Sequence, residues 1–320
     1  MNLSRSAVLT GAGATVVAAL SKPADALAAS AEIPVGGAAN ESSGTVLYAN
    51  DLGFFQKAGL DVKLTVLTNP APMLAALVSG SMAIAGIPLS QAALARAKGI
   101  PIVMIAPGSL HLSTVPANAL IVLKDSPIQQ AADLNGKTIA TRDLANMSYL
   151  GARAWIDKNG GDSKSVRWLE ISDPQHVAAM KSGRVDAASV GEPAFDDALR
   201  GGQVRVLGPV FDAIALRFLI AGYCTSETFA KANPDVIIRF ADAINAAAHW
   251  ANQTKNYAQS AQIIGRYAMA PVLPDSTRVV YAEQARAADI QPVLDVLLAY
   301  GFLKTPMRAN ELVSPLIHLT

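Results

Sequence analysis

The chain has 320 residues, of which 51% are hydrophobic, 6% aromatic and 16% charged, with a formal net charge of +1. This length can hold two domains with substantial cores, and the near-neutral charge gives no electrostatic reason to expect nucleic acid or an anionic membrane surface as a partner. The single cysteine, Cys224, excludes an internal disulfide and a cysteine-based metal cluster.

The first residues have the pattern of a secretory signal peptide. A short basic segment at 1–6 precedes an apolar stretch at 7–20, and Ala26-Leu27-Ala28 offers a small-x-small cleavage site. The apolar stretch is too short for a comfortable membrane span, and no later stretch reaches about 18 uninterrupted apolar residues. The sequence therefore predicts that residues 1–28 are removed and that the rest is exported to the periplasm as a soluble protein. The general secretory and twin-arginine routes both remain open.

Strands and helices alternate through the first third of the chain, which predicts a parallel sheet with helices on both faces. The expected elements are a strand at 32–35, a polar loop at 36–44, a helix at 45–57, a strand at 60–67, a helix at 71–79, a strand at 82–86, a helix from 88 and a strand at 101–106.

A second alternating series follows, and its end changes to consecutive helices. Strands are expected at 119–123, 137–141, 166–171, 185–190 and 204–207, with helices at 127–136, up to 159, at 174–182 and at 193–200. The predicted division is a signal peptide at 1–28, a first lobe at 29–117 and 218–320, and a second lobe at 118–217. Two chain crossings between the lobes would form a hinge.

One pattern occurs in both halves. A helix ends at Ser-Gly (79–80 and 182–183), an apolar strand follows, and a loop with Pro88 or Pro193 begins the next helix. Ligands of such sheets bind beyond the carboxyl ends of the strands. The loops at 86–90 and 191–195 are therefore expected to face each other across a cleft, as in a binding protein with two jaws.

Several polar residues could line this cleft, and each also has a purely structural interpretation. Arg142 lies where a strand meets a helix N-terminus, so it and the nearby amides could bind an anion, or Arg142 could point to solvent. Glu192 could accept hydrogen bonds from a ligand amine, or stabilise its own helix. His111 follows a strand end and could face the cleft or be structural, and Phe195 could flank a ligand or pack in the core.

The segment Asp51-Leu-Gly-Phe-Phe-Gln-Lys-Ala-Gly-Leu-Asp-Val62 resembles a signature of the solute-binding proteins of nitrate, sulfonate and taurine ABC transporters, a group also called SsuA/THI5-like or NMT1-like. Further similar segments are Leu120–Ile128, Ala132–Ile139, Gly183–Ala187 and Glu192-Pro193. The resemblance implies an α/β, type II periplasmic-binding-protein fold, with two doubly wound lobes joined by a two-strand hinge. It also implies delivery of a small ligand to an ABC permease in the inner membrane.

In this group ligand contacts come from the loop after the first strand and from four further loops. Together with the analysis above, this predicts a ligand site made of Asn40, Ser42, Ser43, Thr45, Pro88, Leu89, Ser90, Gly108, Ser109, His111, Arg142, Asn146, Met147, Glu192 and Phe195. The first loop lacks the proline and aromatic residue often present in the group, so taurine or nitrate is not assumed as the ligand.

The expected ligand is a small organic anion, a sulfonate or carboxylate with an apolar body. The alternatives are an amine-bearing pyrimidine related to thiamine, an enzyme of the THI5-like pyrimidine synthase type, and a sensor subunit. The enzyme would bring a cysteine-rich motif, which one cysteine does not supply. No catalytic residue, cofactor, metal or nucleic-acid partner is predicted, and the protein is expected to be a monomer.

Overall fold

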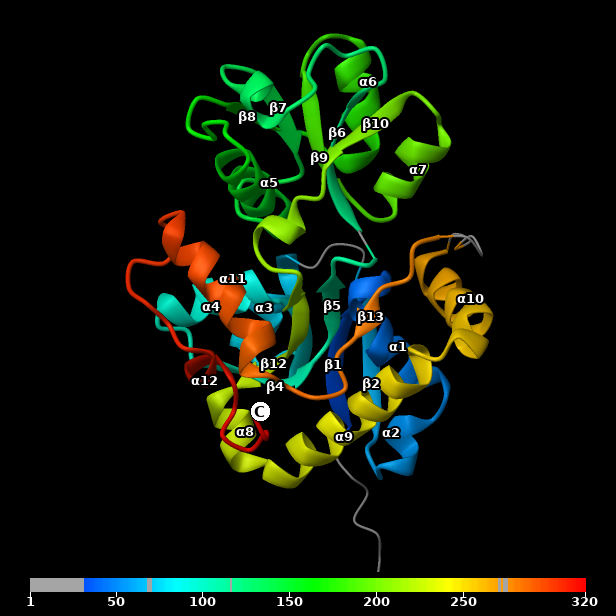
Figure 1. Cartoon of the computed structure of the whole chain (residues 1–320). Helices are drawn as coiled ribbons and strands as arrows, with labels where there is room; N and C mark the ends of the chain where they lie inside the picture. Colours follow the sequence, from blue (N-terminus) through cyan, green and yellow to red (C-terminus); the bar gives the residue numbers. More distant parts are fainter. Residues whose placement is uncertain (1–31, 68–70, 116, 270–271, 273–275) are drawn as a thin grey trace, which may run out of the picture. The chain divides into compact units, whose positions relative to one another are not determined.

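The described residues form two five-stranded sheets and one small three-stranded sheet. A computed structural model describes residues 32–67, 71–115, 117–269, 272 and 276–320 (Figure 1). The predicted signal peptide and its cleavage site lie outside these residues. Glu32–Thr320 forms one compact unit.

The first sheet has the strand order β2-β1-β3-β12-β4 and defines lobe 1. Its elements are β1 (Ile33–Ala38), η1 (Glu41–Ser43), α1 (Gly44–Asp51), α2 (Phe54–Lys57), β2 (Val62–Leu67), α3 (Ala71–Ser79), β3 (Ile84–Pro88), α4 (Leu89–Ala97), β4 (Ile102–Pro107) and β12 (Ala221–Ser226).

The second sheet has the order β10-β6-β9-β7-β8 and defines lobe 2. Its elements are β6 (Asn118–Leu123), η2 (Ala131–Leu134), β7 (Thr138–Thr141), α5 (Met147–Lys158), β8 (Arg167–Glu170), η3 (Asp173–Gln175), α6 (His176–Lys181), β9 (Ala187–Gly191), α7 (Ala194–Arg200), β10 (Val204–Gly208) and η4 (Phe211–Ala213).

A small third sheet joins the two crossings, and helices dominate the remaining chain. Strand β5 (Ser109–Leu112) pairs antiparallel with β11 (Arg217–Leu219) on one side and β13 (Val280–Tyr281) on the other. The other elements after lobe 2 are α8 (Glu227–Ala232), α9 (Pro234–Ala251), η5 (Thr254–Asn256), α10 (Tyr257–Ala268), α11 (Ala287–Ala299) and α12 (Ala309–Leu312). The predicted hinge thus contains a third strand.

The parallel sheets expected from the β-α alternation are mixed, with parallel and antiparallel strands. β12 runs antiparallel between β3 and β4, and β6 runs antiparallel to both β9 and β10. The physical reason is the pair of crossings: β6 enters lobe 2 and β12 re-enters lobe 1 from the hinge side. These strands start where the β-α strands of their sheets end.

The helix predicted at 127–136 does not form, apart from the short turn η2. The amides of Gln129 and Gln130 donate to the Asp133 carboxylate at 2.8 and 3.1 Å. Arg205 from β10 donates to the carbonyls of Ser126 and, at shorter range, of residue 128. Side chains therefore satisfy the backbone groups that helical hydrogen bonds would otherwise use.

The helix predicted at 45–57 is divided into α1 and α2. Gly53 between them has φ +74°, a left-handed conformation that interrupts the helix. Gly80 and Gly183 also have positive φ and end α3 and α6 as the repeated pattern predicts. Pro88 and Pro193 occupy the N-cap positions of α4 and α7, one residue before the first helical position that was predicted for them.

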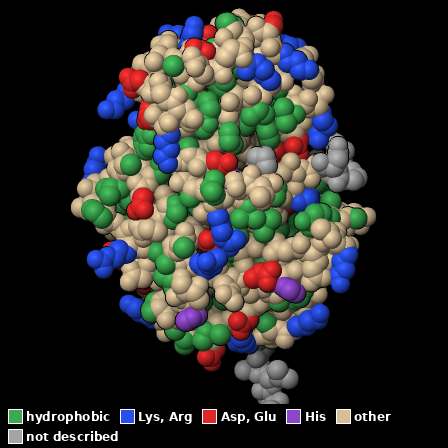
Figure 2. Space-filling model, viewed as in Figure 1, with side chains coloured by type: hydrophobic (Ala, Val, Ile, Leu, Met, Phe, Trp, Pro, Cys, Tyr) green, Lys and Arg blue, Asp and Glu red, His purple; other side chains and the backbone are tan. Residues whose placement is uncertain are grey.

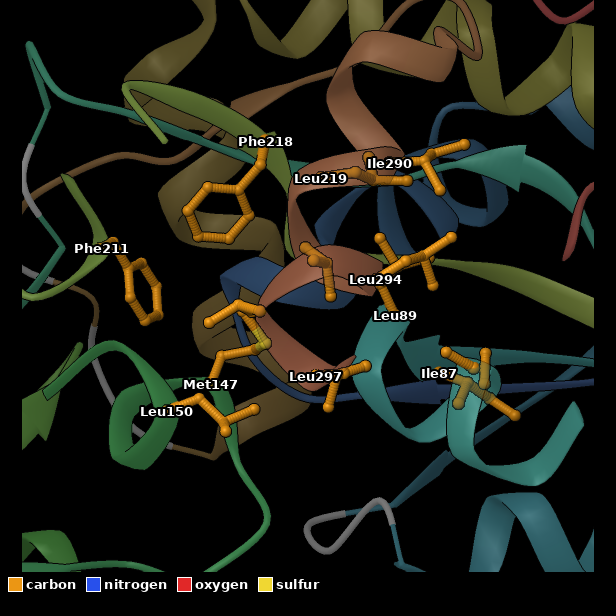
Figure 3. Close-up of a cluster of buried hydrophobic side chains, with 14 of the residues drawn as sticks. Ile87, Leu89, Met147, Leu150, Phe211, Phe218, Leu219, Ile290, Leu294 and Leu297 are labelled. Atoms are coloured by element: carbon orange, nitrogen blue, oxygen red, sulfur yellow. The ribbon is translucent and has the colours of Figure 1, made fainter. Parts of the chain in front are cut away.

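The largest hydrophobic cluster contains residues from both lobes. Met147 and Leu150 of α5 belong to the same cluster as Leu294 and Leu297 of α11 (Figure 3). A second cluster fills lobe 1 beneath α1 and α9, where the Phe55 and Phe240 rings stack with centroids 5.3 Å apart. A third, around α6 and α7, contains only residues of lobe 2.

The surface carries dispersed charge. On the face shown in Figure 2, lysine and arginine side chains are interspersed with acidic ones and do not gather into one patch. None of the helices in the described part of the chain has the length and apolar character that crossing a membrane requires.

Candidate functional site

The loop after β1 presents two of the predicted residues at its surface. Asn40 is exposed and caps η1, since its Oδ1 accepts a hydrogen bond from the Ser43 amide at 3.3 Å. Ser42 is half-buried in the same turn. Both could touch a ligand at the carboxyl end of β1.

Ser43 and Thr45 are buried beneath this loop. The Thr45 hydroxyl lies 2.7 Å from the Tyr223 hydroxyl, which also bonds the Val46 amide at 3.0 Å and the Ser43 carbonyl at 3.4 Å. Tyr223 belongs to β12, which lies between β3 and β4 in the sheet. These hydroxyls therefore hold the start of α1 and support the loop from below.

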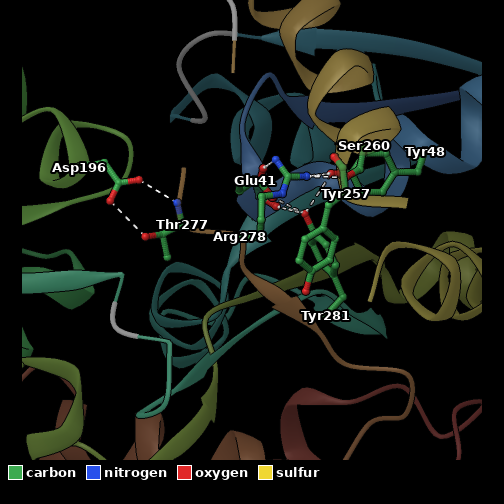
Figure 4. Close-up of polar contacts among 8 residues, drawn as sticks. All are labelled: Glu41, Tyr48, Asp196, Tyr257, Ser260, Thr277, Arg278 and Tyr281. Atoms are coloured by element: carbon green, nitrogen blue, oxygen red, sulfur yellow. Dashed lines mark hydrogen bonds and ion pairs between the residues drawn. The ribbon is translucent and has the colours of Figure 1, made fainter. Parts of the chain in front are cut away.

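Glu41, between Asn40 and Ser42, is the centre of a buried polar network (Figure 4). Its carboxylate forms an ion pair with Arg278, whose side chain is 9% exposed, and accepts a hydrogen bond from the Tyr281 hydroxyl at 2.9 Å. Arg278 also donates to the Tyr48 hydroxyl at 3.2 Å and to Ser260 Oγ at 2.6 Å. Burial raises the pKa of Glu41, and Arg278 opposes that rise.

Thr277, next to Arg278, connects this network to lobe 2. Its amide donates to Asp196 Oδ2 at 2.8 Å, and its hydroxyl lies 3.1 Å from Asp196 Oδ1 (Figure 4). Asp196 lies in the first turn of α7. The Asp196 carboxylate of lobe 2 is thereby hydrogen-bonded to Thr277. The next residue, Arg278, pairs with Glu41 in the first loop of lobe 1.

Glu192 lies at the end of β9, four residues before Asp196. Burial, together with the charge of Asp196 and a side-chain hydrogen bond to it, raises the pKa of Glu192 to about 9. The Glu192 carboxyl group therefore carries a proton at neutral pH. Its Oε1 is buried and has no hydrogen-bond partner among the described residues.

The loop just before α5 has carboxylate partners of its own. The amides of Leu144 and Ala145 donate to the carboxylates of Glu170 and Asp143 at 3.0 and 2.9 Å. Arg142 has a 57% exposed side chain and lies 3.5 Å from Asp173. Acidic side chains of the protein thus occupy these two loop amides and lie beside Arg142.

Asn146 caps α5 and keeps one unused donor. Its Oδ1 accepts from the Tyr149 amide at 2.7 Å, so the carbonyl side of the amide is engaged. Its Nδ2 is buried without a hydrogen-bond partner in the part of the chain that the structure describes. Asn146 can therefore donate to a bound ligand.

The hinge residues are enclosed. A Cβ on Gly108 would lie 2.7 Å from the Ala221 carbonyl oxygen, so the two crossings approach too closely there for another side chain. Ser109 is fully buried, and its Oγ has no partner among the described residues. His111 is buried between the Phe211 and Phe218 rings, with its Nε2 2.8 Å from Asp212 Oδ1. Burial lowers the pKa of His111, which is the behaviour of a structural histidine.

The predicted apolar contacts are mostly part of the cores. Leu89 and Met147 belong to the cluster that spans the lobes, and Phe195 belongs to the cluster of lobe 2. Ser90 is buried, while Pro88 is half-buried at the end of β3. The side chains of Leu89, Met147 and Phe195 therefore pack in the apolar clusters, which is the structural alternative to a ligand contact.

The polar residues that connect the lobes were not singled out from the sequence. Glu41 was part of the predicted loop, and Asp196 was part of the predicted helix at 193–200. No sequence pattern marked Thr277 and Arg278 as site residues, because they lie more than 230 residues from Glu41 and outside any loop predicted to line the cleft.

A cavity of about 600 Å³ lies elsewhere, lined by α8, α12 and the C-terminal segment. Its charged side chains serve one another: Arg96 forms an ion pair with Glu227 and donates to the carbonyl of residue 311 at 2.9 Å. The described residues bring no three His, Cys, Asp or Glu side chains together in a metal-binding arrangement.

A family model described as NMT1/THI5 like matches residues 40–257, which is more than half of the chain. This chain belongs to the NMT1/THI5-like family. The match includes the first loop, the hinge strand β5 and all of lobe 2, and it confirms the family resemblance that the motif at 51–62 indicated.

Solved structures confirm the two-lobed periplasmic-binding-protein fold. The aliphatic sulphonate binding protein SsuA from Escherichia coli is similar with a TM-score of 0.72 and 18% identity, over 90% of this chain and 93% of that one. The nitrate-binding protein NrtA from Synechocystis PCC 6803 is similar with a TM-score of 0.70 and 16% identity, over 88% and 84%. At these identities the similarity shows the fold alone.

Two curated relatives match shorter segments. The formylaminopyrimidine-binding protein of Halalkalibacterium halodurans is 30% identical over 145 residues, which are 45% of this chain and 42% of that protein. A putative thiamine biosynthesis protein of Haemophilus influenzae is 34% identical over 102 residues, 31% of each chain. The chain thus matches less than half of the length of either relative.

Proposed function

We propose that this protein is the periplasmic solute-binding component of an ABC importer, which captures a small organic ligand between its lobes and delivers it to a permease in the inner membrane. Family membership and the two-lobed fold support this role. The named structural neighbours are binding proteins of sulfonate and nitrate. Here the two lobes meet at polar residues that follow the strand ends, where such sheets bind ligands.

The ligand that we infer is an amine-bearing pyrimidine of the thiamine-precursor class, and the Glu192 carboxyl group is the observation that carries this inference. The proton of the Glu192 carboxyl group is shared with Asp196, so the group offers a ligand its unpartnered Oε1 as an acceptor. The amino group of an aminopyrimidine supplies the matching donor. The raised pKa of Glu192 and its unpartnered Oε1 fit such a contact, as does the formylaminopyrimidine-binding relative.

The charges around the two lobes' contact disfavour the anionic ligand expected from the sequence. Glu192 and Asp196 lie together on lobe 2, and the buried Arg278 is already paired with Glu41. Arg142 lies beside Asp173. An added sulfonate or carboxylate would bring only acceptors to a surface that already has several.

An organic anion remains the second candidate, because Asn146 Nδ2 is a buried donor without a partner among the described residues, at the N-terminus of a twelve-residue helix. An enzyme of the pyrimidine synthase type is less well supported. Cys224 is fully buried within β12, and burial raises the pKa of its thiol to about 12, so this thiol is not a nucleophile.

A thermal-shift screen tests the ligand class. A ligand at a hundred times its dissociation constant adds about 2.7 kcal/mol of stability, and we expect this from formylaminopyrimidine and not from alkanesulfonates. Stabilisation by alkanesulfonates alone would contradict the pyrimidine assignment.

Matched variants test the role of Glu192. Glu192→Gln keeps a donor and an acceptor and should bind within about fivefold of wild type, whereas Glu192→Ala should weaken binding by about tenfold or more. Asp197→Asn, on the exposed side of α7, is the control. Equal losses from the Gln and Ala variants would show that an ionised carboxylate, not a protonated one, meets the ligand.

A further inference from the structure

Among the described residues, two contacts join the lobes outside the hinge strands and differ in kind. The first joins α5 of lobe 2 to α11 and the residues after it. Met147 and Leu150 pack in one cluster with Leu294 and Leu297 (Figure 3). We call this the α5–α11 contact.

Polar and aromatic groups extend the α5–α11 contact. The Tyr300 hydroxyl donates to Asp157 Oδ2 at 2.7 Å, and the Arg153 guanidinium lies 4.6 Å from the Tyr300 ring centroid. On the next turn, the Tyr149 and Phe302 rings meet edge to face at 6.3 Å. Separation here would expose apolar area and break several interactions at once.

The second contact is made by α7 and rests on one carboxylate. Asp196 accepts both hydrogen bonds from Thr277 (Figure 4). Among the described residues, the apolar side chains Phe195 and Ala198 of α7 belong to a cluster made of lobe 2 residues. Separation here exchanges two hydrogen bonds for bonds to water. None of the three apolar clusters in the described part of the chain contains both α7 and lobe 1 residues.

We propose that the lobes open on one side only: the α5–α11 contact is the pivot, the Asp196–Thr277 contact is the latch, and the ligand enters past α7. The role in ligand entry rests on the proposed function, whereas the one-sided opening does not. The reason is the difference between the contacts, since a rotation that keeps the apolar contact and breaks the polar one costs least.

The latch also reaches the first loop of lobe 1. Thr277 is followed by Arg278, which pairs with Glu41, and by Tyr281, which bonds Glu41 and pairs with the hinge strand β5. One short segment thus contacts lobe 2, the hinge and the loop at Asn40. Release of the latch therefore separates α7 from a segment that stays bound to lobe 1 and the hinge.

Spin-label distances in the ligand-free protein test the asymmetry. The only native cysteine, Cys224, is buried, so introduced cysteines can be labelled selectively. One pair, Leu199→Cys with Gln259→Cys, reports across the latch. The other, Lys164→Cys with Thr305→Cys, reports across the pivot. All four positions are exposed.

We expect Asp196→Ala to lengthen the latch distance by more than about 2 Å, the scale of domain rearrangements, and to leave the pivot distance unchanged. Asp197→Ala, which removes the same charge one residue away and breaks an ion pair within α7, should change neither distance. Thr277→Val, which keeps the amide donor, should give a smaller shift.

Equal lengthening across both pairs, or none across the latch, would overturn the proposal. Because these distances are measured without ligand, they stand or fall independently of the binding screen. If formylaminopyrimidine then binds, its addition should restore the short latch distance in Asp196→Ala.

Discussion

Replacement of Arg278 by methionine should destabilise the protein strongly, because this arginine is nearly enclosed. Its side chain is 9% exposed, it pairs with Glu41, which is 16% exposed, and it donates to Tyr48 and Ser260. Removal of one partner from a buried ion pair costs roughly 3–5 kcal/mol. Glu41 can take up a proton when Arg278 is absent, so we expect the lower end, about 3 kcal/mol.

Urea unfolding followed by tryptophan fluorescence measures this loss, since the Trp250 ring lies 5.5 Å from Tyr48 beside the network. Arg266→Met is the matched control. Arg266 pairs with Asp51, but its side chain is 67% exposed, and such surface pairs contribute about 0–1 kcal/mol.

The combination with Glu41→Gln separates the ion pair from the packing. Because the two residues interact directly, the double variant should lose less than the sum of the single losses, by roughly 0.5–3 kcal/mol. The loss in Arg278→Met should also grow as pH rises, because an unpaired Glu41 must then ionise in a buried site. An Arg278→Met loss no greater than that of Arg266→Met, or strict additivity with Glu41→Gln, would refute this account.

Two further predictions concern Glu192 and the hinge. The pKa of Glu192 is raised to about 9 in the folded protein, so above pH 4.5 the folded state binds more protons than the unfolded state, and stability falls as pH rises toward 9. Glu192→Gln should therefore gain thermal stability over wild type progressively from pH 5 to 9. A difference that stays constant over this pH range would contradict the prediction. Gly108→Ala should lose about 1–3 kcal/mol of stability in urea unfolding because its Cβ would meet the Ala221 backbone oxygen. Gly201→Ala, where the atoms nearest to the added Cβ lie at 3.4 Å, should stay near wild type. Equal stability of the two variants would show that the hinge backbone shifts to accommodate the methyl group.

Local signals predicted the elements of the fold well. Apolar runs bounded by glycine produced the strands and helices near their expected positions, because burial periodicity and left-handed glycine turns act within a few residues. Gly80 and Gly183 end their helices as the repeated pattern indicates. The family motif at 51–62 likewise indicated the two-lobed fold, which the solved structures confirm.

The predictions of local structure failed where contacts with residues distant in the sequence decided the conformation. The helix expected at 127–136 is replaced by a loop because Arg205, some 80 residues later, binds its carbonyls. The antiparallel strands β6 and β12 take their direction from the hinge, which no local periodicity records. For the site, the loops at Asn40 and Glu192 could be predicted from strand ends, but their surroundings could not.

The sequence by itself determined that this is a two-lobed α/β protein whose loops at strand ends form the candidate site, because strand and helix formation and glycine turns depend on neighbouring residues. Only the tertiary structure decided the charges of that site. It placed Arg278 against Glu41 and Thr277 against Asp196. It also buried the Glu192 carboxyl group enough to raise its pKa, so that this group keeps its proton at neutral pH. Burial and partner charges set these properties, and both arise from segments that meet only when the chain has folded.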